Sequence, residues 1–164
     1  MCVENNKVSV IIPAYNAARF IAETVESVMH STYAFIEVII VNDGSTDSTD
    51  QELSIIKLKY PEIKILEQEN KGVAVARNLA ISHASGKYIL PLDADDLISP
   101  DYIQKAYEIL RKNEDVKVVY SQAEFIGDKT GLWKLPPFRL ELLARKNLIF
   151  VSGLYRKSDY EQTG

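Results

Sequence analysis

Short runs of β-branched and other apolar residues alternate with amphipathic segments over the first 120 residues, and this alternation constrains the fold more than any other feature. The apolar runs predict strands at 8–12, 36–41, 63–66, 88–92 and 116–120. Apolar residues at helical spacing predict helices over 17–30, up to about residue 60, over 72–83 and around 103–110. Strands that alternate with helices form mainly parallel sheets with helices on both faces. We therefore expect an α/β fold with a Rossmann-like central sheet.

Two further expectations concern single residues in these elements. Pro13 has no N–H to donate to a neighbouring strand, so we expect it to end the first strand. In the helix over 72–83, the spacing of the apolar residues predicts that Val73, Ala76, Leu79 and Ala80 face the core. Beyond residue 121, glycines and prolines interrupt the pattern, and no strong period returns until Val151.

The composition indicates one globular domain over residues 1–164, with residues 1–6 expected to be disordered. At 164 residues, 46% of them hydrophobic, the chain is long enough to bury about 70% of its unfolded surface. A net charge of -4 gives general nucleic-acid binding no electrostatic support. The single cysteine, Cys2, offers no disulfide framework and fits a reducing, cytoplasmic compartment. No apolar run approaches the roughly 20 residues that a membrane-spanning helix needs.

The fourth predicted strand ends in three carboxylates, Asp93, Asp95 and Asp96. Carboxylates this close repel one another unless solvent or a cation neutralises them. Oxygen-only ligands suit Mg²⁺ or Mn²⁺, and Mg²⁺ is usually held by one or two carboxylates together with the phosphates of a substrate. The alternative is a solvated acidic turn that caps the next helix, because the residues at 99–101 also have the pattern of a helix start.

Polar turns also follow the first two predicted strands, at 13–16 and 42–47. Loops at the carboxyl ends of parallel strands converge on a crevice, so these turns and the acidic one are expected to meet. Tyr15 is placed to stack on a base, and Asp43 and Ser45 are suited to a base edge or a ribose hydroxyl. The structural alternatives are a half-buried aromatic for Tyr15 and an Asx turn beside Gly44 for Asp43.

Basic residues gather between Lys129 and Lys157, where seven of them face a single acid, Glu141. The same segment contains Trp133 and an apolar run at 138–143. Three interpretations are open: peripheral contact with an anionic membrane surface, contact with a phosphorylated substrate, or a solvated face.

The three turns and their flanking strands together resemble a known family. The segments VSVIIPAYN, VIIVNDGSTDST and ENKGVAVARNLAISHASGKYILPLDADD are similar, in this order, to the amino-terminal half of a family 2 glycosyltransferase with the GT-A fold. The resemblance extends over essentially the whole chain from Val8 onward. By contrast, the chain has no GxxxxGK[ST] loop or GxGxxG turn, and no acidic pair follows the first strand as a phosphoacceptor signalling domain would require.

The resemblance implies a nucleotide-sugar donor site and a divalent metal. It implies that the turn after the first strand surrounds the base and ribose, and that Arg77 lies near the diphosphate. Of the two aspartates of the DxD pattern, it implies that Asp93 lies toward the ribose and that Asp95 binds the metal. From the residues alone, Arg77 is equally a helix-surface arginine paired to an acid. The nucleotide-sugar-binding residues implied are Pro13, Ala14, Tyr15, Asn16, Asp43, Ser45, Arg77, Asp93, Ala94 and Asp95. The implied metal-binding residues are Asp95, Asp93 and Asp96, the last as a ligand or as support for one, with Mn²⁺ or Mg²⁺ as the ion.

The resemblance also implies the reaction: inverting transfer of a sugar from a nucleotide-diphospho-sugar, UDP being the expected nucleotide, to a glycan or lipid-linked acceptor. The general base of the family lies in an acidic motif beyond the point matched by Gly164, so we expect the chain to be truncated before it. Neither Asp159 nor Glu161 is nominated for that role. The alternative is therefore a donor-binding module with little transferase activity. We expect it in the cytoplasm, at the inner face of the membrane if the basic segment makes that contact.

Overall fold

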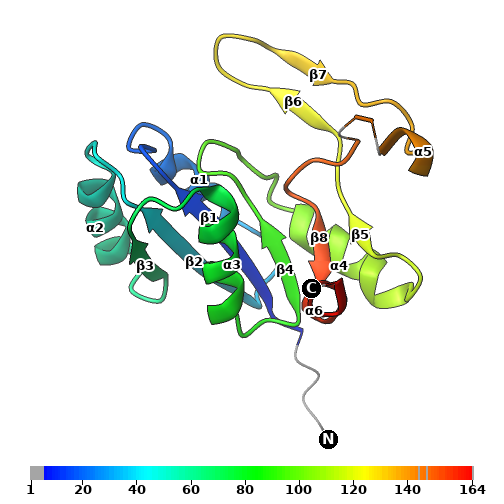
Figure 1. Cartoon of the computed structure of the whole chain (residues 1–164), viewed down its shortest axis with the longest axis horizontal. Coiled ribbons are helices and arrows are strands. Elements are labelled where there is room, and N and C mark those ends of the chain that lie inside the picture. Colours follow the sequence, from blue (N-terminus) through cyan, green and yellow to red (C-terminus); the bar gives the residue numbers. More distant parts are fainter. Residues whose placement is uncertain (1–5, 144, 147, 164) are drawn as a thin grey trace, which may run out of the picture.

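A computed structural model describes residues 6–143, 145, 146 and 148–163. Its centre is a six-stranded sheet in the order β3-β2-β1-β4-β8-β5 (Figure 1). The strands are β1 (Val8–Ala14), β2 (Ile36–Asp43), β3 (Lys64–Gln68), β4 (Tyr88–Pro91), β5 (Val118–Val119) and β8 (Leu154–Arg156). Strands β3, β2, β1 and β4 are parallel, whereas β8 is antiparallel to both β4 and β5. The prediction of a mainly parallel sheet is confirmed.

Strand β1 is the centre of this sheet, and all seven of its residues are buried. Its residues pair with β2 from Val8 to Ala14 and with β4 from Val8 to Ile11. The expectation that Pro13 ends the strand is wrong. Pro13 lies beyond the last pair with β4, so only one side of the strand still needs N–H donors there, and the missing donor of proline is tolerated.

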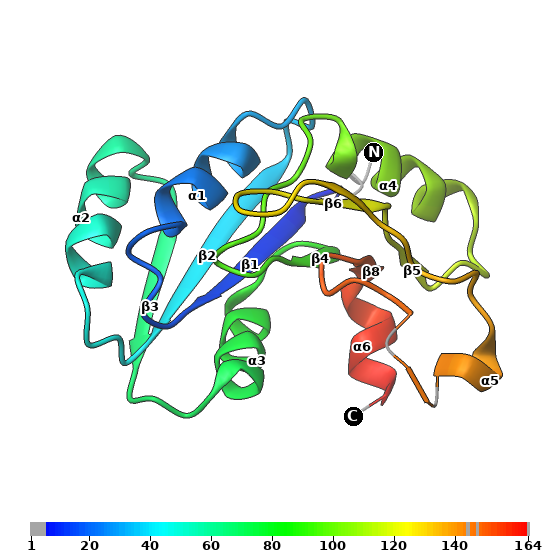
Figure 2. The ribbon, with the colours of Figure 1, turned by 90° about the horizontal axis from the view of Figure 1, so that it is seen from above.

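Four longer helices and one short one cover the sheet. Helices α1 (Ile21–Met29), α2 (Thr49–Lys59) and α4 (Tyr102–Lys112) lie on one face, and α3 (Val73–His83) and α6 (Lys157–Thr163) lie on the other (Figure 2). Helix α1 is shorter than predicted, because residues 17–20 form turns before it. The alternation of side chains along β1 separates two cores, with Val10 and Ile12 on the α1 side and Ile11 on the α3 side.

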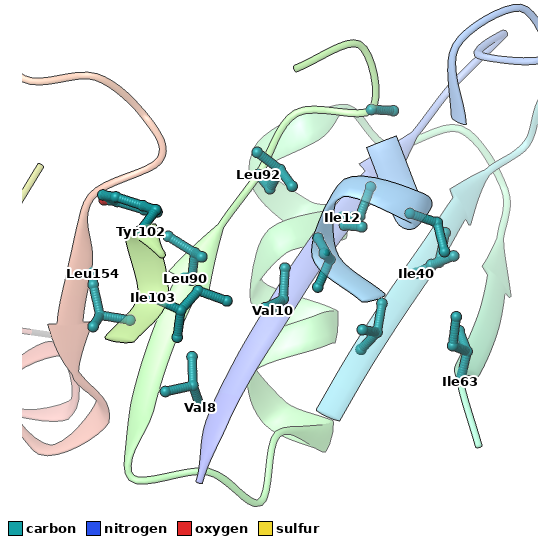
Figure 3. Close-up of a cluster of buried hydrophobic side chains, with 14 of the residues drawn as sticks. Val8, Val10, Ile12, Ile40, Ile63, Leu90, Leu92, Tyr102, Ile103 and Leu154 are labelled. Carbon is teal, nitrogen blue, oxygen red and sulfur yellow. The ribbon is translucent and has the colours of Figure 1, made fainter. Parts of the chain in front are cut away.

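The larger core joins β1, β2 and β4 to α4 and β8. Figure 3 shows Val10 and Ile12 beside Ile40 and Leu90, with Ile103 and Leu154 continuing the cluster. The smaller core is built on α3, where Ala76 and Ala80 are fully buried against the sheet. Two small residues here let α3 lie close to β1 and β2. The inward orientation predicted for Val73 is wrong, since this side chain is half exposed at the first turn of α3.

The sequence analysis did not predict the strands and helix that follow β5 or the way the chain returns to the central sheet. Strands β6 (Ala123–Phe125) and β7 (Gly131–Trp133) form a separate antiparallel hairpin, and the short helix α5 (Leu140–Leu143) follows it. The chain then returns to insert β8 between β4 and β5. The Arg156 guanidinium fixes this return by donating to the carbonyl oxygens of Leu110, Asn113 and Val116 at 2.5–2.9 Å.

The predicted disorder of residues 1–6 lies outside the described residues except for Asn6. The carbonyl of Asn6 accepts a hydrogen bond from the Tyr33 hydroxyl at 2.6 Å.

Glu37 joins several elements at the amino ends of the strands. Its Oε1 accepts hydrogen bonds from Ser9 Oγ at 2.5 Å, the Ser85 N–H at 2.6 Å and the Gly86 N–H at 3.0 Å. Its Oε2 lies 3.1 Å from Lys64 Nζ. Burial alone raises the pKa of Glu37, but the hydrogen bonds from Ser9, Lys64 and Ser85 outweigh burial and lower this pKa to about 2.

This environment makes the stability contribution of Glu37 depend on pH. Because the pKa is lower in the folded chain than the ordinary 4.5, the contribution is complete above about pH 5 and is lost as the pH falls toward 2. We expect Glu37→Gln to lower the free energy of unfolding by at most about 3 kcal/mol at pH 7. The difference from the wild type should shrink steadily between pH 5 and pH 2 in urea denaturation.

Glu69→Gln is the matched control, since Glu69 is exposed and forms no hydrogen bond or ion pair with any described residue. A Glu37→Gln deficit that stayed constant down to pH 2 would contradict the assignment.

Candidate active site

A cavity of about 380 Å³ opens where β1 and β4 end and α3 begins. Seven residues predicted for donor binding line it together: Pro13, Tyr15, Asn16, Arg77, Asp93, Ala94 and Asp95. Ala17, Phe20 and Val73 also line it, and the sequence analysis did not predict them. Val73 lies one helical turn before Arg77, so helical spacing from Arg77 was a usable signal. No comparable signal pointed to Phe20.

Hydrogen bonds tie the turn after β1 to the turn after β2. Ser45 Oγ accepts from the Asn16 N–H at 3.0 Å, and Asn16 Oδ1 accepts from the Thr46 N–H at 2.8 Å. Thr49 Oγ1 accepts from the Ala17 N–H at 2.9 Å. Asn16 has a positive φ of 51°, a conformation that asparagine tolerates better than most residues. The polar side chains of both turns thus fix the backbone that carries Tyr15, whose side chain is half exposed at the cavity.

Asp43 is buried beside the cavity and does not line it. Its Oδ1 accepts from Gln68 Nε2 at 2.6 Å and the Lys71 N–H at 2.9 Å, and its Oδ2 accepts from the Gly72 N–H at 2.9 Å. Burial raises the pKa of Asp43, but these hydrogen bonds outweigh burial and hold it below its ordinary value. The carboxylate therefore connects the end of β2 to the loop that starts α3. Ala14, which is buried at the end of β1, also does not line the cavity.

Arg77 and Asp93 form an ion pair inside the cavity, with Nη2 and Oδ1 2.5 Å apart. Both side chains are partly buried. Arg77 Nε is buried, and it is the only such side-chain atom without a hydrogen-bond partner among the residues that the structure describes. A buried guanidinium N–H without an acceptor is costly. The arginine is thus paired to an acid, as one interpretation of the sequence had it, but that acid belongs to the site itself.

The three carboxylates after β4 differ in their surroundings. Asp95 lies on the cavity, Asp93 is held by Arg77, and Asp96 is exposed next to them. Partial desolvation, together with the negative charges of Asp93 and Asp95, raises the pKa of Asp96 above its ordinary value. The turn does not cap the next helix, because α4 begins only at Tyr102.

These surroundings fit a divalent cation that is shared with a ligand. No three acidic, histidine or cysteine residues in the described part of the chain form a complete metal-binding group. The three carboxylates repel one another, and a cation would offset that repulsion. The donor atoms are all oxygens, which suits Mg²⁺ or Mn²⁺.

Cavity size alone does not identify this site. A cavity of about 510 Å³ opens at the other edge of the sheet, lined by residues that include Lys7, Glu37 and Lys64. There the Glu37 carboxylate is already satisfied by its hydrogen bonds. The smaller cavity holds the acidic strand end, the partly buried Arg77 and the half-exposed ring of Tyr15.

A parallel sheet whose strand ends gather an aromatic ring, an arginine and a DxD turn around one cavity defines a GT-A glycosyltransferase fold. Residues 9–161 match glycosyl transferase family 2. The chain belongs to this family.

Curated relatives of the chain carry glycosyltransferase and synthase names. The chain is 36% identical over 138 residues to the uncharacterised glycosyltransferase YibD of Escherichia coli K12, which covers 84% of this chain and 40% of the relative. It is 39% identical over 114 residues to a chondroitin synthase of Pasteurella multocida, covering 70% of this chain and 12% of the relative. The chain spans less than half the length of the curated relatives it matches.

Solved structures share the fold. The TM-score is 0.69 with S. aureus TarS 1-349 in complex with UDP-GlcNAc, at 21% identity over 96% of this chain and 47% of that one. It is 0.74 with the mannosyltransferase PcManGT of Pyrobaculum calidifontis in complex with GDP-Man and Mn²⁺, at 23% identity over 96% of this chain and 46% of that one. Among the described residues, no helix has the length and apolar character to cross a bilayer.

Gly44 is required where the two turns and the loop before α3 meet. Its φ is +66°, and a Cβ on it would lie 2.7 Å from the backbone nitrogen of Asn70. We expect Gly44→Ala to lower the free energy of unfolding by about 2–4 kcal/mol, because the conformational cost adds to the collision with the backbone. Chemical denaturation measures this difference.

The control is Gly127→Ala, which also has a positive φ but has no atom within 4 Å of the added carbon. It should cost only about 1–2 kcal/mol. Equal losses for the two variants would show that the contact with Asn70 is unimportant.

Proposed function

We propose that this chain is the donor domain of a metal-dependent, inverting glycosyltransferase that uses a nucleotide-diphospho-sugar, with UDP as the nucleotide. The observation that carries the proposal is the convergence of Tyr15, Arg77, Asp93 and Asp95 on one cavity. Each of these groups suits a different part of such a donor. Support also comes from the structural neighbours that contain UDP-GlcNAc or GDP-Man.

In this proposal the nucleoside lies against the turn after β1. Tyr15 stacks on the base, with Pro13 and Ala14 forming the backbone around it. Asp43 Oδ2 accepts only one hydrogen bond from the described residues and retains capacity to accept another from a base N–H. Asn16 and Ser45 act mainly by holding the turn, since their side chains already bond across it.

The diphosphate lies between Arg77 and the acidic turn. Asp95 and Asp93 hold the ion with Asp96 beside them, and Ala94 contributes the short backbone between them. When bound, Mn²⁺ or Mg²⁺ neutralises the charge that develops on the departing nucleoside diphosphate. Arg77 donates forked hydrogen bonds to the phosphate oxygens. The phosphate oxygens can also accept a hydrogen bond from Arg77 Nε, which has no partner among the described residues.

The acceptor is a glycan or a lipid-linked saccharide used in polysaccharide biosynthesis at the cytoplasmic face of the membrane. Its hydroxyl needs a general base, and among the described residues the carboxylates that line the cavity are Asp93 and Asp95, which the donor site employs. The proposal therefore assigns the base to none of residues 1–164, which act as a nucleotide-sugar-binding domain with little transferase activity of their own.

Metal-dependent donor binding is the first test. We expect UDP to bind with Mn²⁺ at least about tenfold more tightly than without it, since a charge-assisted contact contributes about 1.5–3 kcal/mol. Asp95→Ala should remove this enhancement while leaving the metal-free affinity unchanged. Isothermal titration calorimetry of UDP, with and without Mn²⁺, measures both affinities.

Asp115→Ala is the control for this experiment, because Asp115 is an exposed acid between α4 and β5, away from the cavity. It should bind UDP as the wild type does. The donor site would be refuted if UDP bound the wild type equally well with and without Mn²⁺ and bound Asp95→Ala as tightly as the wild type.

The second test concerns transfer. We expect the chain to bind the donor but to release free nucleotide slowly. Without a general base, the rate of transfer should be lower by a factor of about 100–10,000 than the rate of a glycosyltransferase that has one. Coupled detection of UDP release, with and without acceptor saccharides, measures the rate. Fast acceptor-dependent turnover by residues 1–164 would disprove the assignment of the base to a position outside them.

A further inference from the structure

Exposed apolar side chains are concentrated in the segment that joins β5 to β8. Seven of the eighteen large apolar side chains that are exposed among the described residues fall within positions 125–143. They are Phe125, Ile126, Leu132, Trp133, Phe138, Leu140 and Leu143. Leu140 is 72% exposed and Ile126 is 60% exposed, so they contribute little to a core. An apolar concentration of this kind marks a surface that contacts something other than water.

This segment projects from the domain on one side. The hairpin β6–β7 stands clear of the sheet beyond the carboxyl ends of the strands, and the chain continues from it to α5 at the side of the molecule (Figures 1 and 2). Seen from above, the hairpin extends across that same edge (Figure 2). We call residues 125–143, 145 and 146 the hairpin surface. The backbone of the hairpin therefore lies on the same side of the molecule as the carboxyl ends of the strands that carry the donor cavity.

Aromatic packing gives the hairpin surface a defined shape. The rings of Phe125 and Trp133 stack with their centroids 4.9 Å apart and 10° between their planes. The ring of Phe150 meets Trp133 edge-on at 5.3 Å. A cavity of about 510 Å³ beside them is lined by residues that include Leu132, Lys134 and Phe138. Trp133 nevertheless remains 47% exposed, so packing within the chain covers only part of it.

The charge of the hairpin surface complements an anionic partner. It contains five basic residues, Lys129, Lys134, Arg139, Arg145 and Lys146, against the two acids Asp128 and Glu141. None of the five forms an ion pair in the described part of the chain. Each remains available for an external negative charge.

We infer that the hairpin surface docks the domain onto an anionic lipid bilayer. Basic residues next to a half-exposed tryptophan and several exposed aliphatic side chains are the pattern of a peripheral membrane surface, where charge attracts the headgroups and apolar groups enter the interface. A site for a soluble phosphate would use the basic residues but would have no use for the exposed Ile126, Leu132 and Leu140. The inference goes beyond the proposed transfer reaction and does not depend on it.

Docking in this way orients the molecule. The hairpin and the carboxyl ends of β1, β2 and β4 lie on the same side of the molecule (Figures 1 and 2), so docking through the hairpin brings the strand ends that carry the donor cavity toward the bilayer. A saccharide carried on a membrane lipid then has a short path to the cavity.

Trp133 reports on docking directly, because it is the only tryptophan of the chain. We expect its fluorescence to shift to shorter wavelength with vesicles of phosphatidylcholine containing 30% phosphatidylglycerol, and to be quenched when the acyl chains are brominated. Vesicles of phosphatidylcholine alone should give at least about tenfold weaker binding, and raising the salt should weaken binding to the anionic vesicles.

Two matched pairs of variants test the residues, with circular dichroism confirming that each variant is folded. Lys134→Gln/Arg139→Gln should weaken vesicle binding by about 10- to 30-fold, whereas Arg111→Gln/Lys112→Gln removes the same charge from α4 and should have little effect. Leu132→Ser/Leu140→Ser should weaken it by about tenfold, whereas Leu58→Ser, at an 84% exposed position on α2, should not.

The inference is overturned if anionic vesicles leave the Trp133 emission wavelength unchanged and brominated acyl chains in such vesicles do not quench it. It is also overturned if the α4 pair weakens binding as much as the hairpin pair, which would indicate only net charge. Inorganic phosphate that displaced the protein more strongly than sodium chloride of equal ionic strength would assign the basic residues to a soluble anion instead. UDP binding should be unchanged in all of these variants, because none of the substituted residues lines the donor cavity.

Discussion

The parallel pairing of β1 with both β2 and β4 is the constraint on which the site depends. Because the three strands run in the same direction, the turns that follow β1, β2 and β4 emerge at one edge of the sheet. The registers of both pairs start together at Val8, so the edge is fixed to within a residue. A slip of one residue would exchange the two buried faces of β1 and expose Val10 and Ile12 to the wrong core, which makes the register costly to change.

The site contains negative charges that repel one another and a positive charge that offsets them only in part. Three carboxylates lie within four residues of sequence, and Arg77 neutralises only one of them. Arg77 itself is incompletely satisfied, with a buried Nε that has no acceptor among the described residues. In the proposed function, one ligand meets both deficits, because a divalent cation offsets the carboxylates and phosphate oxygens accept from the guanidinium. The ion pair between Arg77 and Asp93 fixes the positions of both side chains at the cavity.

The sequence predicted the strands and the convergence of the turns that follow them, because both depend on local patterns. Runs of β-branched residues that are apolar on both faces favour interior strands, and turns at the carboxyl ends of neighbouring parallel strands lie at one edge of the sheet. It did not predict β8 or the β6–β7 hairpin, because three-residue strands carry no period and their pairing with distant strands is not local. Val73 was misplaced although the helical register was right. The first turn of α3 extends past the end of the sheet, so its inward stripe meets the cavity instead of the core.

The sequence also could not assign roles within the turns, since a polar side chain there can either contact a ligand or bond to the backbone of the chain itself. Asn16, Ser45 and Asp43 have the residue types expected for nucleotide contact, yet most of their hydrogen-bonding capacity is used on neighbouring backbone. This use is functional in its own right. A tyrosine in a free turn would have to be ordered at the moment of binding, and that ordering would weaken affinity. With Tyr15 carried on a turn already fixed by Asn16 and Ser45, the cost is met during folding. The sequence motifs contain both Tyr15 and the residues that hold its turn, and only the hydrogen bonds of the folded chain separate the two groups.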